Sequence, residues 1–343
     1  MKFLVDLTCE GGALLFYSLI RRLQEKGHEV YITSRHYDKA NELQKSLGLK
    51  ASIIGRHGGA SLYGKLRAYA LRVERLADYL IEHNVDAVVS NAGPEICRVG
   101  YGLGLKVFTW NDMPEAEAQT RLTVPLSTWV FTPWIIPKEE FTKYGISGGH
   151  IYQYPALYPM AWLPNIKVDD KIVQKLALSS ENPIILFRES EGRAAYLLDK
   201  KSIVLSAVRT LAEKHRGWQF ISRARYDAGE LKSELKDLPN TYIFDEPIDM
   251  QSLLAKADFL IGGGATMNIE AAYYGTPVIA CRQIEVRYER FLIQAGLAIK
   301  AHSDRHIVEL AERVLGNRND DLARRVFGRM HYPLEEIIEI MEE

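Results

Sequence analysis

Hydrophobic and polar positions follow two alternating patterns along the first half of the chain. Short apolar runs of about five residues, typical of buried strands, are separated by longer stretches with apolar positions every three or four residues, typical of amphipathic helices. The helical pattern is clearest at residues 14–26, which end at Gly27, and at residues 62–83. Such alternation predicts βα units and a parallel sheet. The predicted strands are residues 3–7, 29–33, 51–54, 86–90, 106–109 and 129–132.

The same alternation restarts after a proline-rich segment. Residues 152–165 read YQYPALYPMAWLPN, follow neither pattern, and predict a linker. From about residue 320 onward the pattern is helical, with no strand after it. The sequence therefore predicts an α/β protein of two Rossmann-like domains, each a doubly wound parallel sheet. The strands predicted in the second half are residues 184–188, 219–222, 242–244, 259–262 and 278–280.

Composition narrows the class of protein. The 343 residues suit two domains of roughly 150 residues, and the 47% hydrophobic and 25% charged content excludes disordered and fibrous proteins. With 43 Lys and Arg against 44 Asp and Glu, the overall charge offers no attraction for nucleic acid, so a bound anion needs a local site.

The three cysteines, Cys9, Cys97 and Cys281, are far apart and form no CxxC pair. This spacing disfavours a disulfide framework or a thiolate metal site and indicates a cytoplasmic protein. No segment reaches the roughly 18 to 20 apolar residues of a membrane span, so we expect at most peripheral membrane contact.

The strongest local signal is a glycine turn in the second half. Residues 261–272 read IGGGATMNIEAA, a predicted strand, a turn and the start of a helix. Glycines let a ligand approach closely, and a helix N-terminus presents N–H groups and a positive dipole end to a phosphate. Glu270 follows one helical turn after Thr266, on the same face, where its carboxylate can accept hydrogen bonds from ribose hydroxyls. The candidate diphosphate ligands are Gly263, Gly264, Ala265, Thr266 and Met267.

An alternative for this segment is a tight βα turn with a surface glutamate. The spacing is not GxGxxG, so a dinucleotide fingerprint is not supported. In the same half, Arg188 ends the strand at 184–188, with Arg193 nearby, and can clamp a phosphate. A surface ion pair is the competing interpretation of Arg188.

An acidic segment, TWNDMPEAE, overlaps the end of the predicted strand at 106–109. Ligands of open parallel sheets bind outside the carboxyl ends of the strands, where this segment would lie. Asp112, Glu115 and Glu117 can supply a general base or, with Asn111, orient sugar hydroxyls. The competing interpretation is structural, with Asp112 as the N-cap of the next helix and the two glutamates in its first turn.

Three further groups follow strands of the first half. His57, in RHGG, can act as an acid or base near neutral pH, or is a solvated loop residue. Asn91, in SNAGPE, can donate to and accept from a sugar, or belongs to a turn and N-cap. Gly11 and Gly12 let the backbone approach a ligand, or form a plain βα turn.

Four segments in order make the chain resemble the archaeal and bacterial DUF354 family of uncharacterised proteins. These proteins are similar to GT-B glycosyltransferases and to non-hydrolysing UDP-N-acetylglucosamine 2-epimerases, and the resemblance covers nearly the whole chain. One departure is that family members often carry a histidine-proline pattern after the first strand, where this chain has CEGG, so that histidine's role cannot be transferred. The four segments are KGHEVYITSR at 26–35, HGG at 57–59, NDMPEAEAQTRLTVPL at 111–126 and GGGATMNIEAAYYGTP at 262–277.

The resemblance implies a GT-B-like fold in which the two domains face a central cleft. The nucleotide would be held mainly by the second domain, with Gly263 to Met267 near the diphosphate and Glu270 on the ribose, and the sugar or acceptor would face the first domain. The expected divisions are an N-terminal acceptor or sugar domain at 1–153, a linker at 154–168, a nucleotide-binding domain at 169–318 and C-terminal helices at 319–343 that pack back on the first domain.

The leading hypothesis is glycosyl transfer from a nucleotide-diphosphate sugar bound in that cleft to an unknown acceptor. A helix dipole and Arg188 would stabilise the departing diphosphate, while a carboxylate such as Glu115 or Glu117, or His57, deprotonates the acceptor. No metal or other cofactor is required if the helix N-terminus carries the charge. The alternatives are a nucleotide-sugar 2-epimerase and a binding protein without catalysis. The base, the sugar, the acceptor and the oligomeric state do not follow from the sequence.

Overall fold

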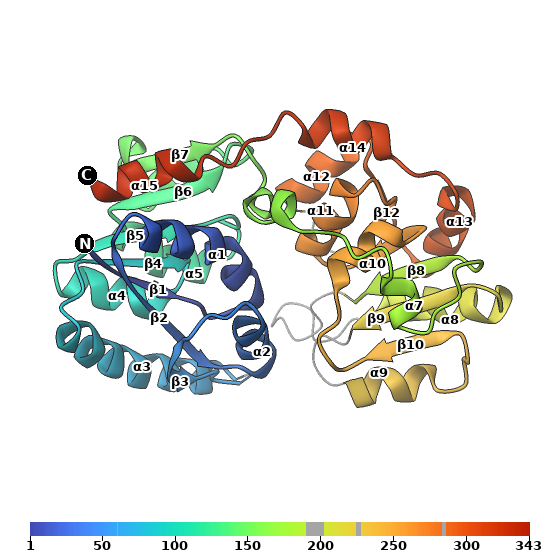
Figure 1. The fold of residues 1–343 in the computed structure, drawn as a ribbon, viewed down its shortest axis with the longest axis horizontal. Helices are drawn as coiled ribbons and strands as arrows, with labels where there is room; N and C mark the ends of the chain where they lie inside the picture. Colours follow the sequence, from blue (N-terminus) through green and yellow to red (C-terminus); the bar gives the residue numbers. More distant parts are fainter. Residues whose placement is uncertain (60, 190–201, 224–227, 283–285) are drawn as a thin grey trace. The chain divides into compact units, whose positions relative to one another are not determined.

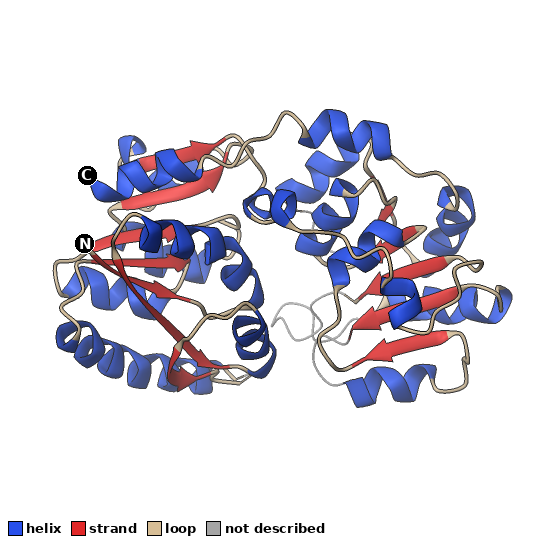
Figure 2. Ribbon diagram, in the orientation of Figure 1, coloured by secondary structure: helices blue, strands red, loops and turns tan. Residues whose placement is uncertain are grey.

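The computed structural model describes residues 1–343 except residues 60, 190–201, 224–227 and 283–285 (Figure 1). The chain forms two compact units, Met1–Pro164 together with Met330–Glu343, and Asn165–Arg329. Each unit contains a parallel sheet flanked by helices (Figure 2), which confirms the predicted fold class of two doubly wound α/β domains.

The described part of the first unit contains a seven-stranded parallel sheet in the order β3-β2-β1-β4-β5-β6-β7. One face carries α3, α4 and α5, and α1, α2 and α15 belong to the other. The strand order reverses between β1 and β4, so their carboxyl ends form the topological switch point of this sheet. The strands are β1 (Lys2–Asp6), β2 (Glu29–His36), β3 (Ser52–Arg56), β4 (Ala87–Asn91), β5 (Lys106–Trp110), β6 (Trp129–Pro133) and β7 (Ile151–Tyr154). The helices are α1 (Glu10–Glu25), α2 (Asp38–Ser46), α3 (Leu62–Glu82), α4 (Pro94–Gly102), α5 (Glu117–Thr123), α6 (Glu139–Thr142) and α15 (Leu334–Glu342).

The described part of the second unit contains a six-stranded parallel sheet in the order β10-β9-β8-β11-β12-β13. Here the order reverses between β8 and β11, which places the switch point of this sheet at the end of those two strands. The strands are β8 (Ile184–Arg188), β9 (Gln219–Arg223), β10 (Thr241–Phe244), β11 (Phe259–Gly262), β12 (Val278–Ala280) and β13 (Ala298–Lys300). The helices are α7 (Ile172–Lys175), α8 (Ile203–Lys214), α9 (Ala228–Leu235), α10 (Met250–Lys256), α11 (Ala265–Tyr273), α12 (Arg287–Gln294), α13 (Asp304–Val314) and α14 (Asp320–Phe327).

Central strands are apolar because helices cover both of their faces. Phe3, Leu4 and Val5 of β1 are fully buried, as are Phe259, Leu260 and Ile261 of β11. Some helices of each unit begin at a side-chain cap: in α3, Ser61 accepts a hydrogen bond from the Gly64 N–H at 3.0 Å, and in α10, Asp249 accepts one from the Ser252 N–H at 3.0 Å.

The segment predicted as a linker at 154–168 is mostly part of the first unit. Its start overlaps β7, which pairs with β6, and it continues as short 3-10 helices at Tyr158–Ala161 and Leu163–Asn165. The first of these packs on α1, and Leu157 and Leu163 are buried. The aromatic and aliphatic residues between the prolines supply this burial, so the chain leaves the first unit only after Pro164.

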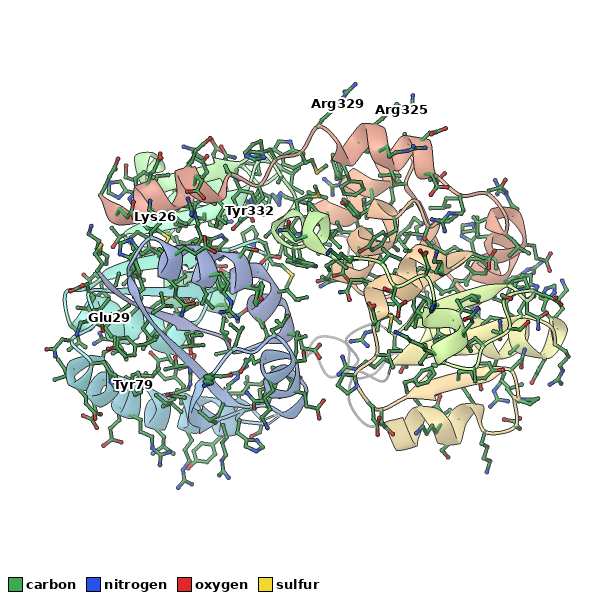
Figure 3. All side chains as sticks on the ribbon, viewed as in Figure 1. Lys26, Glu29, Tyr79, Arg325, Arg329 and Tyr332 are labelled. Atoms are coloured by element: carbon green, nitrogen blue, oxygen red, sulfur yellow. The ribbon has the colours of Figure 1, made fainter. Side chains whose placement is uncertain are left out.

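The C-terminal segment also divides differently from the expected 319–343. Helix α14 packs on α11 in the second unit, where the Asn319 N–H donates to the Gly275 carbonyl at 2.7 Å. Only residues from Met330 onward return to the first unit. There Glu335 of α15 pairs with Arg22 at 2.7 Å, and the Tyr332 hydroxyl accepts from the Trp110 indole at 3.0 Å (Figure 3 labels Tyr332).

Candidate functional site

The glycine turn of the second unit joins β11 to α11 at the switch point. Gly264 occupies the N-cap position of α11 and has no side chain to cap it. The Gly263 N–H donates to the Arg188 carbonyl at 2.8 Å, which fixes the turn to the end of β8. The first turn of α11, from Ala265 through Thr266 to Met267, therefore begins without a side-chain cap and presents a positive dipole end.

A neutral amide beneath this turn explains why its first position is glycine. Asn268 is 2% exposed, and its Nδ2 donates to the Gly262 carbonyl at 3.3 Å. A Cβ on Gly262 would lie 1.7 Å from the Asn268 Oδ1, so a larger residue there would force the Asn268 side chain to move. The sequence analysis missed Asn268, although an asparagine inside an otherwise apolar helix segment is the signal for such a contact.

Glu270 is buried in α11, 6% exposed, which contradicts the interpretation of a surface glutamate. The Gln251 Nε2 of α10 donates to its Oε1 at 3.3 Å. The carboxylate also raises the pKa of Tyr274, whose hydroxyl is already desolvated by burial. A buried carboxylate with a positioned amide neighbour is a preorganised hydrogen-bond acceptor.

Arg188 lies at the same switch point, opposite Gly262 in the register of β8 and β11. Its Nη1 donates to the Arg223 carbonyl at 2.6 Å, and its Cγ would lie 3.9 Å from a Cβ placed on Gly264. The structure thus brings together Arg188 and the glycine turn. Arg193 lies outside the described residues.

At the first unit's switch point, Gly11 and Gly12 form the first turn of α1. The Gly12 N–H donates to the Cys9 Sγ at 3.4 Å, and a Cβ on Gly11 would meet no atom within 4 Å. Burial, followed by the weaker repulsion of Asp112, raises the pKa of the Cys9 thiol. Cys9 is therefore a protonated thiol near neutral pH and caps the helix.

Asn91 is half-buried at the end of β4, beside β1. Its side chain makes no hydrogen bond to any described residue. The next residue, Ala92, has φ 47°, a left-handed conformation that is uncommon for a residue with a Cβ. Gly93, not Asn91, occupies the N-cap position of α4, so Asn91 is a polar side chain at a strained turn of the switch point.

The acidic segment does not cap a helix through Asp112. Helix α5 begins at Glu117 after Ala116, so Asp112 is not its N-cap and Glu115 lies before it, whereas Glu117 does lie in its first turn. Asn111 is buried and holds the loop: its Nδ2 donates to the Thr120 Oγ1 at 3.2 Å, and its Oδ1 accepts from the Met113 N–H at 3.1 Å.

The carboxylates of this segment have different surroundings. Asp112 is partly buried, and burial, with a smaller contribution from Glu115, raises its pKa to about 6. Glu115 and Glu117 are exposed, and Glu117 pairs with Arg121 at 2.6 Å. Asp112 is therefore the carboxyl suited to exchange protons near neutral pH. Glu115 and Glu117 instead line an open cavity of about 460 Å³, together with Pro114, Arg121, Glu140, Lys143 and Tyr144.

His57 is exposed beyond β3, where its ring stacks on Tyr37 at 5.4 Å. Burial of the ring, followed by the charges of Arg35 and Lys65, lowers its pKa, so it is neutral at pH 7. It lies on the same sheet edge as Asp112, but three strands lie between β3 and β5. The two strands are therefore four inter-strand spacings apart, about 19 Å at ~4.8 Å per spacing. The structure does not bring these two candidates together.

Two arginines that the sequence analysis missed lie at this edge. The charge of Arg35, near the end of β2, adds to the burial that lowers the pKa of His57 and opposes the rise in the pKa of Cys9, and its buried Nε has no hydrogen-bond partner among the described residues. Arg72 of α3 is fully buried, and its guanidinium donates to both carboxylate oxygens of Asp6, at 2.6 and 3.0 Å. An arginine on the apolar face of a predicted helix is the signal that indicates such a buried pair.

The described residues lack both a cluster of metal-binding side chains and a membrane-spanning helix. They contain no group of three His, Cys, Asp or Glu side chains placed to bind a metal ion. Within the same residues, no helix has both the length and the apolar character needed to cross a membrane.

Comparison with known proteins assigns the family and the fold. Residues 1–341 match the model of DUF354, a protein of unknown function. An uncharacterised protein of Methanocaldococcus jannaschii is 27% identical over 320 residues, 92% of each chain.

Solved structures with the same fold include two epimerases and a transferase. UDP-GlcNAc 2-epimerase from Neisseria meningitidis, bound to UDP-GlcNAc, superposes with a TM-score of 0.78 at 16% identity, covering 100% of both chains. The M. jannaschii UDP-GlcNAc 2-epimerase in complex with UDP-GlcNAc and UDP superposes with a TM-score of 0.77 at 16% identity. The match covers 100% of this chain and 99% of that chain. The spinosyn rhamnosyltransferase SpnG superposes with a TM-score of 0.67 at 15% identity, covering 100% of both chains. The chain therefore belongs to the DUF354 family and has a GT-B-like fold.

Proposed function

We propose that this chain binds a nucleotide-diphosphate sugar and transfers its glycosyl group to an acceptor hydroxyl. The observation that carries the proposal is the N-terminus of α11 at the switch point, which begins at the glycine Gly264, with Arg188 beside it and Glu270 buried further along the helix. The helix end and the guanidinium suit a diphosphate, and the carboxylate suits a pair of ribose hydroxyls. Solved structures of the same fold hold UDP-GlcNAc.

In this reaction the acceptor oxygen forms a bond to the anomeric carbon while the bond from that carbon to the diphosphate breaks. The diphosphate leaves with the electron pair, and the α11 N-terminus and Arg188 stabilise its charge. The acceptor's proton passes to a base, a role that the pKa of about 6 favours for Asp112. Because fixed protein charges stabilise the leaving group, the proposal includes no metal or other cofactor.

Asp112 replaces the two glutamates as the preferred base. Glu117 is held in an exposed ion pair, and both it and Glu115 line the open cavity. His57, which is neutral at pH 7, suits a contact to a sugar hydroxyl. Asn91, whose amide makes no hydrogen bond to a described residue, lies at the end of β4 beside β1 and is a second candidate for sugar contact.

A nucleotide-sugar 2-epimerase is the second candidate, favoured by the higher structural similarity to the two 2-epimerases than to the rhamnosyltransferase. Epimerisation removes the C2 proton of the sugar and returns a proton from solvent to the opposite face. In heavy water the recovered nucleotide sugar would therefore carry deuterium at C2, whereas simple transfer leaves that position unlabelled.

The test is incubation of the full chain with a panel of nucleotide sugars and hydroxyl acceptors in heavy water. Acceptor-dependent release of nucleoside diphosphate without C2 labelling supports transfer. C2 labelling without release supports the epimerase instead, and tight binding without turnover supports a binding protein. Absence of both binding and turnover across the panel would contradict the nucleotide-sugar assignment. Asp112→Asn serves as the control, because it should retain binding and lose transfer.

A further inference from the structure

Helix α3 carries one continuous apolar stripe that is covered at one end only. Its members are spaced by alternating steps of four and three residues, which places them on one face of the helix. Leu76 and Leu80 are fully buried, Tyr69 and Val73 are partly buried, and Leu66 and Leu62 are 66% and 79% exposed. The stripe consists of Leu62, Leu66, Tyr69, Val73, Leu76 and Leu80.

The loss of burial arises because only the later turns of α3 pack on the sheet and on α4. Leu76 and Leu80 join the core cluster of β1, β4, β5 and α4, whereas Leu62 and Leu66 have no place in it. Tyr63, adjacent to the stripe, is also 72% exposed. The first two turns therefore present three large apolar side chains to the surroundings on an outer helix of the first unit (Figure 1).

These first turns form a defined structure. Ser61 caps the helix, and Gly58 packs so closely on Gly64 and Lys65 that a Cβ on Gly58 would lie 2.5 Å from the Lys65 Cα. The loop that carries His57 is thereby attached to the exposed turn. The exposed apolar surface is thus an ordered part of the fold.

Charge is segregated along the same helix. Residues 43–73 contain no Asp or Glu, and the exposed turn carries Lys65 and Arg67 among its apolar residues. Glu74, Asp78 and Glu82 all lie on the later turns. In a chain with a net charge of −1, this places a local positive charge directly beside the uncovered apolar residues.

We propose that the first two turns of α3, residues 62–67, dock on the surface of an anionic lipid bilayer. Leu62, Tyr63 and Leu66 enter the boundary between headgroups and acyl chains, and Lys65 and Arg67 lie against the anionic headgroups. A contact with a second copy is disfavoured, since three side chains are far fewer than the ~20 to 30 residues a side of a stable protein interface. If the same turns of two copies faced each other, Lys65 and Arg67 of one copy would also lie close to those of the other and repel them. The inference does not depend on the proposed function.

The test is co-sedimentation of the full chain with vesicles of phosphatidylglycerol and phosphatidylcholine, or of phosphatidylcholine alone. We expect the chain to bind the mixed vesicles and to bind vesicles of phosphatidylcholine alone at least about tenfold more weakly. Binding to the mixed vesicles should fall at high salt. Leu62→Ser/Leu66→Ser should weaken binding about tenfold or more, and Lys65→Gln/Arg67→Gln about fivefold for each charge. Ile81→Ser, a change at a 64% exposed residue of the acidic end of α3, is the matched control and should bind like the wild type.

Three results would overturn the proposal. One is no binding of the wild type to the mixed vesicles at low salt. Another is binding that Leu62→Ser/Leu66→Ser leaves unchanged, or that Ile81→Ser weakens equally. The third, measured by light scattering, is conversion of a wild-type dimer to a monomer by Leu62→Ser/Leu66→Ser, which would assign the surface to a contact between copies.

Discussion

The switch points of the two sheets are built from different chemistry. In the first unit, ionisable side chains gather at the edge together with an amide that bonds to no described residue; these are Asp112, Cys9, Arg35 and Asn91, on neighbouring loops and strand ends. In the second unit, glycines and a helix N-terminus form the edge, with a guanidinium beside them. Fixed backbone dipoles suit the constant diphosphate of a ligand, whereas groups that titrate suit the part that reacts.

The residues beneath the two edges differ in the same way. A buried ion pair, Arg72 with Asp6, supports the first edge and also holds the end of β3, because the Arg72 Nε donates to the Ile54 carbonyl at 2.9 Å. Neutral amides support the second edge, where Asn268 holds the turn and Gln251 holds Glu270. The first edge therefore depends on charge balance, and the second on close packing.

The largest expected effect is on the buried pair of the first unit. We expect Arg72→Leu to lower the free energy of unfolding by about 3 to 5 kcal/mol, because it leaves the Asp6 carboxylate buried without its partner. Chemical denaturation measures this difference. The double variant Asp6→Leu/Arg72→Leu should lose less than the single one, and an equal or larger loss would show that packing rather than charge balance dominates.

The next effect concerns the nucleotide. If Glu270 accepts ribose hydroxyls, Glu270→Gln should weaken nucleotide binding by roughly 1.5 to 3 kcal/mol, about ten- to a hundredfold, since it removes charge-assisted hydrogen bonds. Calorimetric titration measures the change, and a deoxyribose analogue should barely distinguish the variant from the wild type. Unchanged affinity would remove Glu270 from the site.

A smaller effect separates Asp112 from an ordinary surface carboxylate. The pKa of Asp112 in the folded chain, about 6, lies above its usual 3.8. Between these two pH values the folded state binds more protons than the unfolded state. The stability of the wild type therefore falls as the pH rises through this range. Asp112→Asn should therefore be more stable than the wild type by about 1 to 2 kcal/mol at pH 8, allowing for partial solvent exposure, and equal near pH 3.

Thermal unfolding at a series of pH values measures this difference in stability between Asp112→Asn and the wild type. A variant that is equally stable at pH 8, or less so, would mean that the carboxylate is not desolvated. The same titration should appear in the activity: transfer by the wild type should rise with pH through about 6 as Asp112 becomes a base.

The smallest effect compares glycines of the two turns. A Cβ on Gly11 meets no atom within 4 Å, so Gly11→Ala in the first turn of α1 should stabilise the chain by about 0.4 to 1 kcal/mol. Gly262→Ala should destabilise it, because of the Asn268 contact. If Gly11 also makes room for a ligand, sugar binding should weaken in the more stable variant, which a paired denaturation and titration experiment would detect.

The strands buried on both faces were predictable because their apolar runs are uninterrupted, as in β1 and β11. Strand β7 was missed because IYQY alternates with polar residues and runs into prolines, and β13 because its three residues, AIK, end in a lysine instead of forming an uninterrupted apolar run like the VIA of β12. Helix α14 was assigned to the wrong unit, since helical periodicity does not identify the surface on which a helix packs.

For the candidate site, the sequence placed the glycine turn correctly because Gly, strand and helix signals coincide within ten residues. It could not distinguish Asp112 from Glu117, since the two carboxyls differ in burial and ion pairing rather than in residue type. Nor could it join Arg72 to Asp6, or Gln251 to Glu270, because these contacts arise only when the sheet and helices assemble.

The most direct test of the account is titration of nucleoside diphosphates into the wild type, Gly264→Ala and Gly264→Asp. Among the described residues, a Cβ at this position has only the Arg188 Cγ within 4 Å, at 3.9 Å, so both variants should fold. An aspartate at the N-cap would occupy the end of α11 with its own carboxylate and repel a diphosphate. We predict that the wild type and Gly264→Ala bind a nucleoside diphosphate and that Gly264→Asp binds it at least about tenfold more weakly. Binding that is equally strong in Gly264→Asp, or absent from the wild type with every base, would contradict the assignment of the nucleotide to the second unit's switch point.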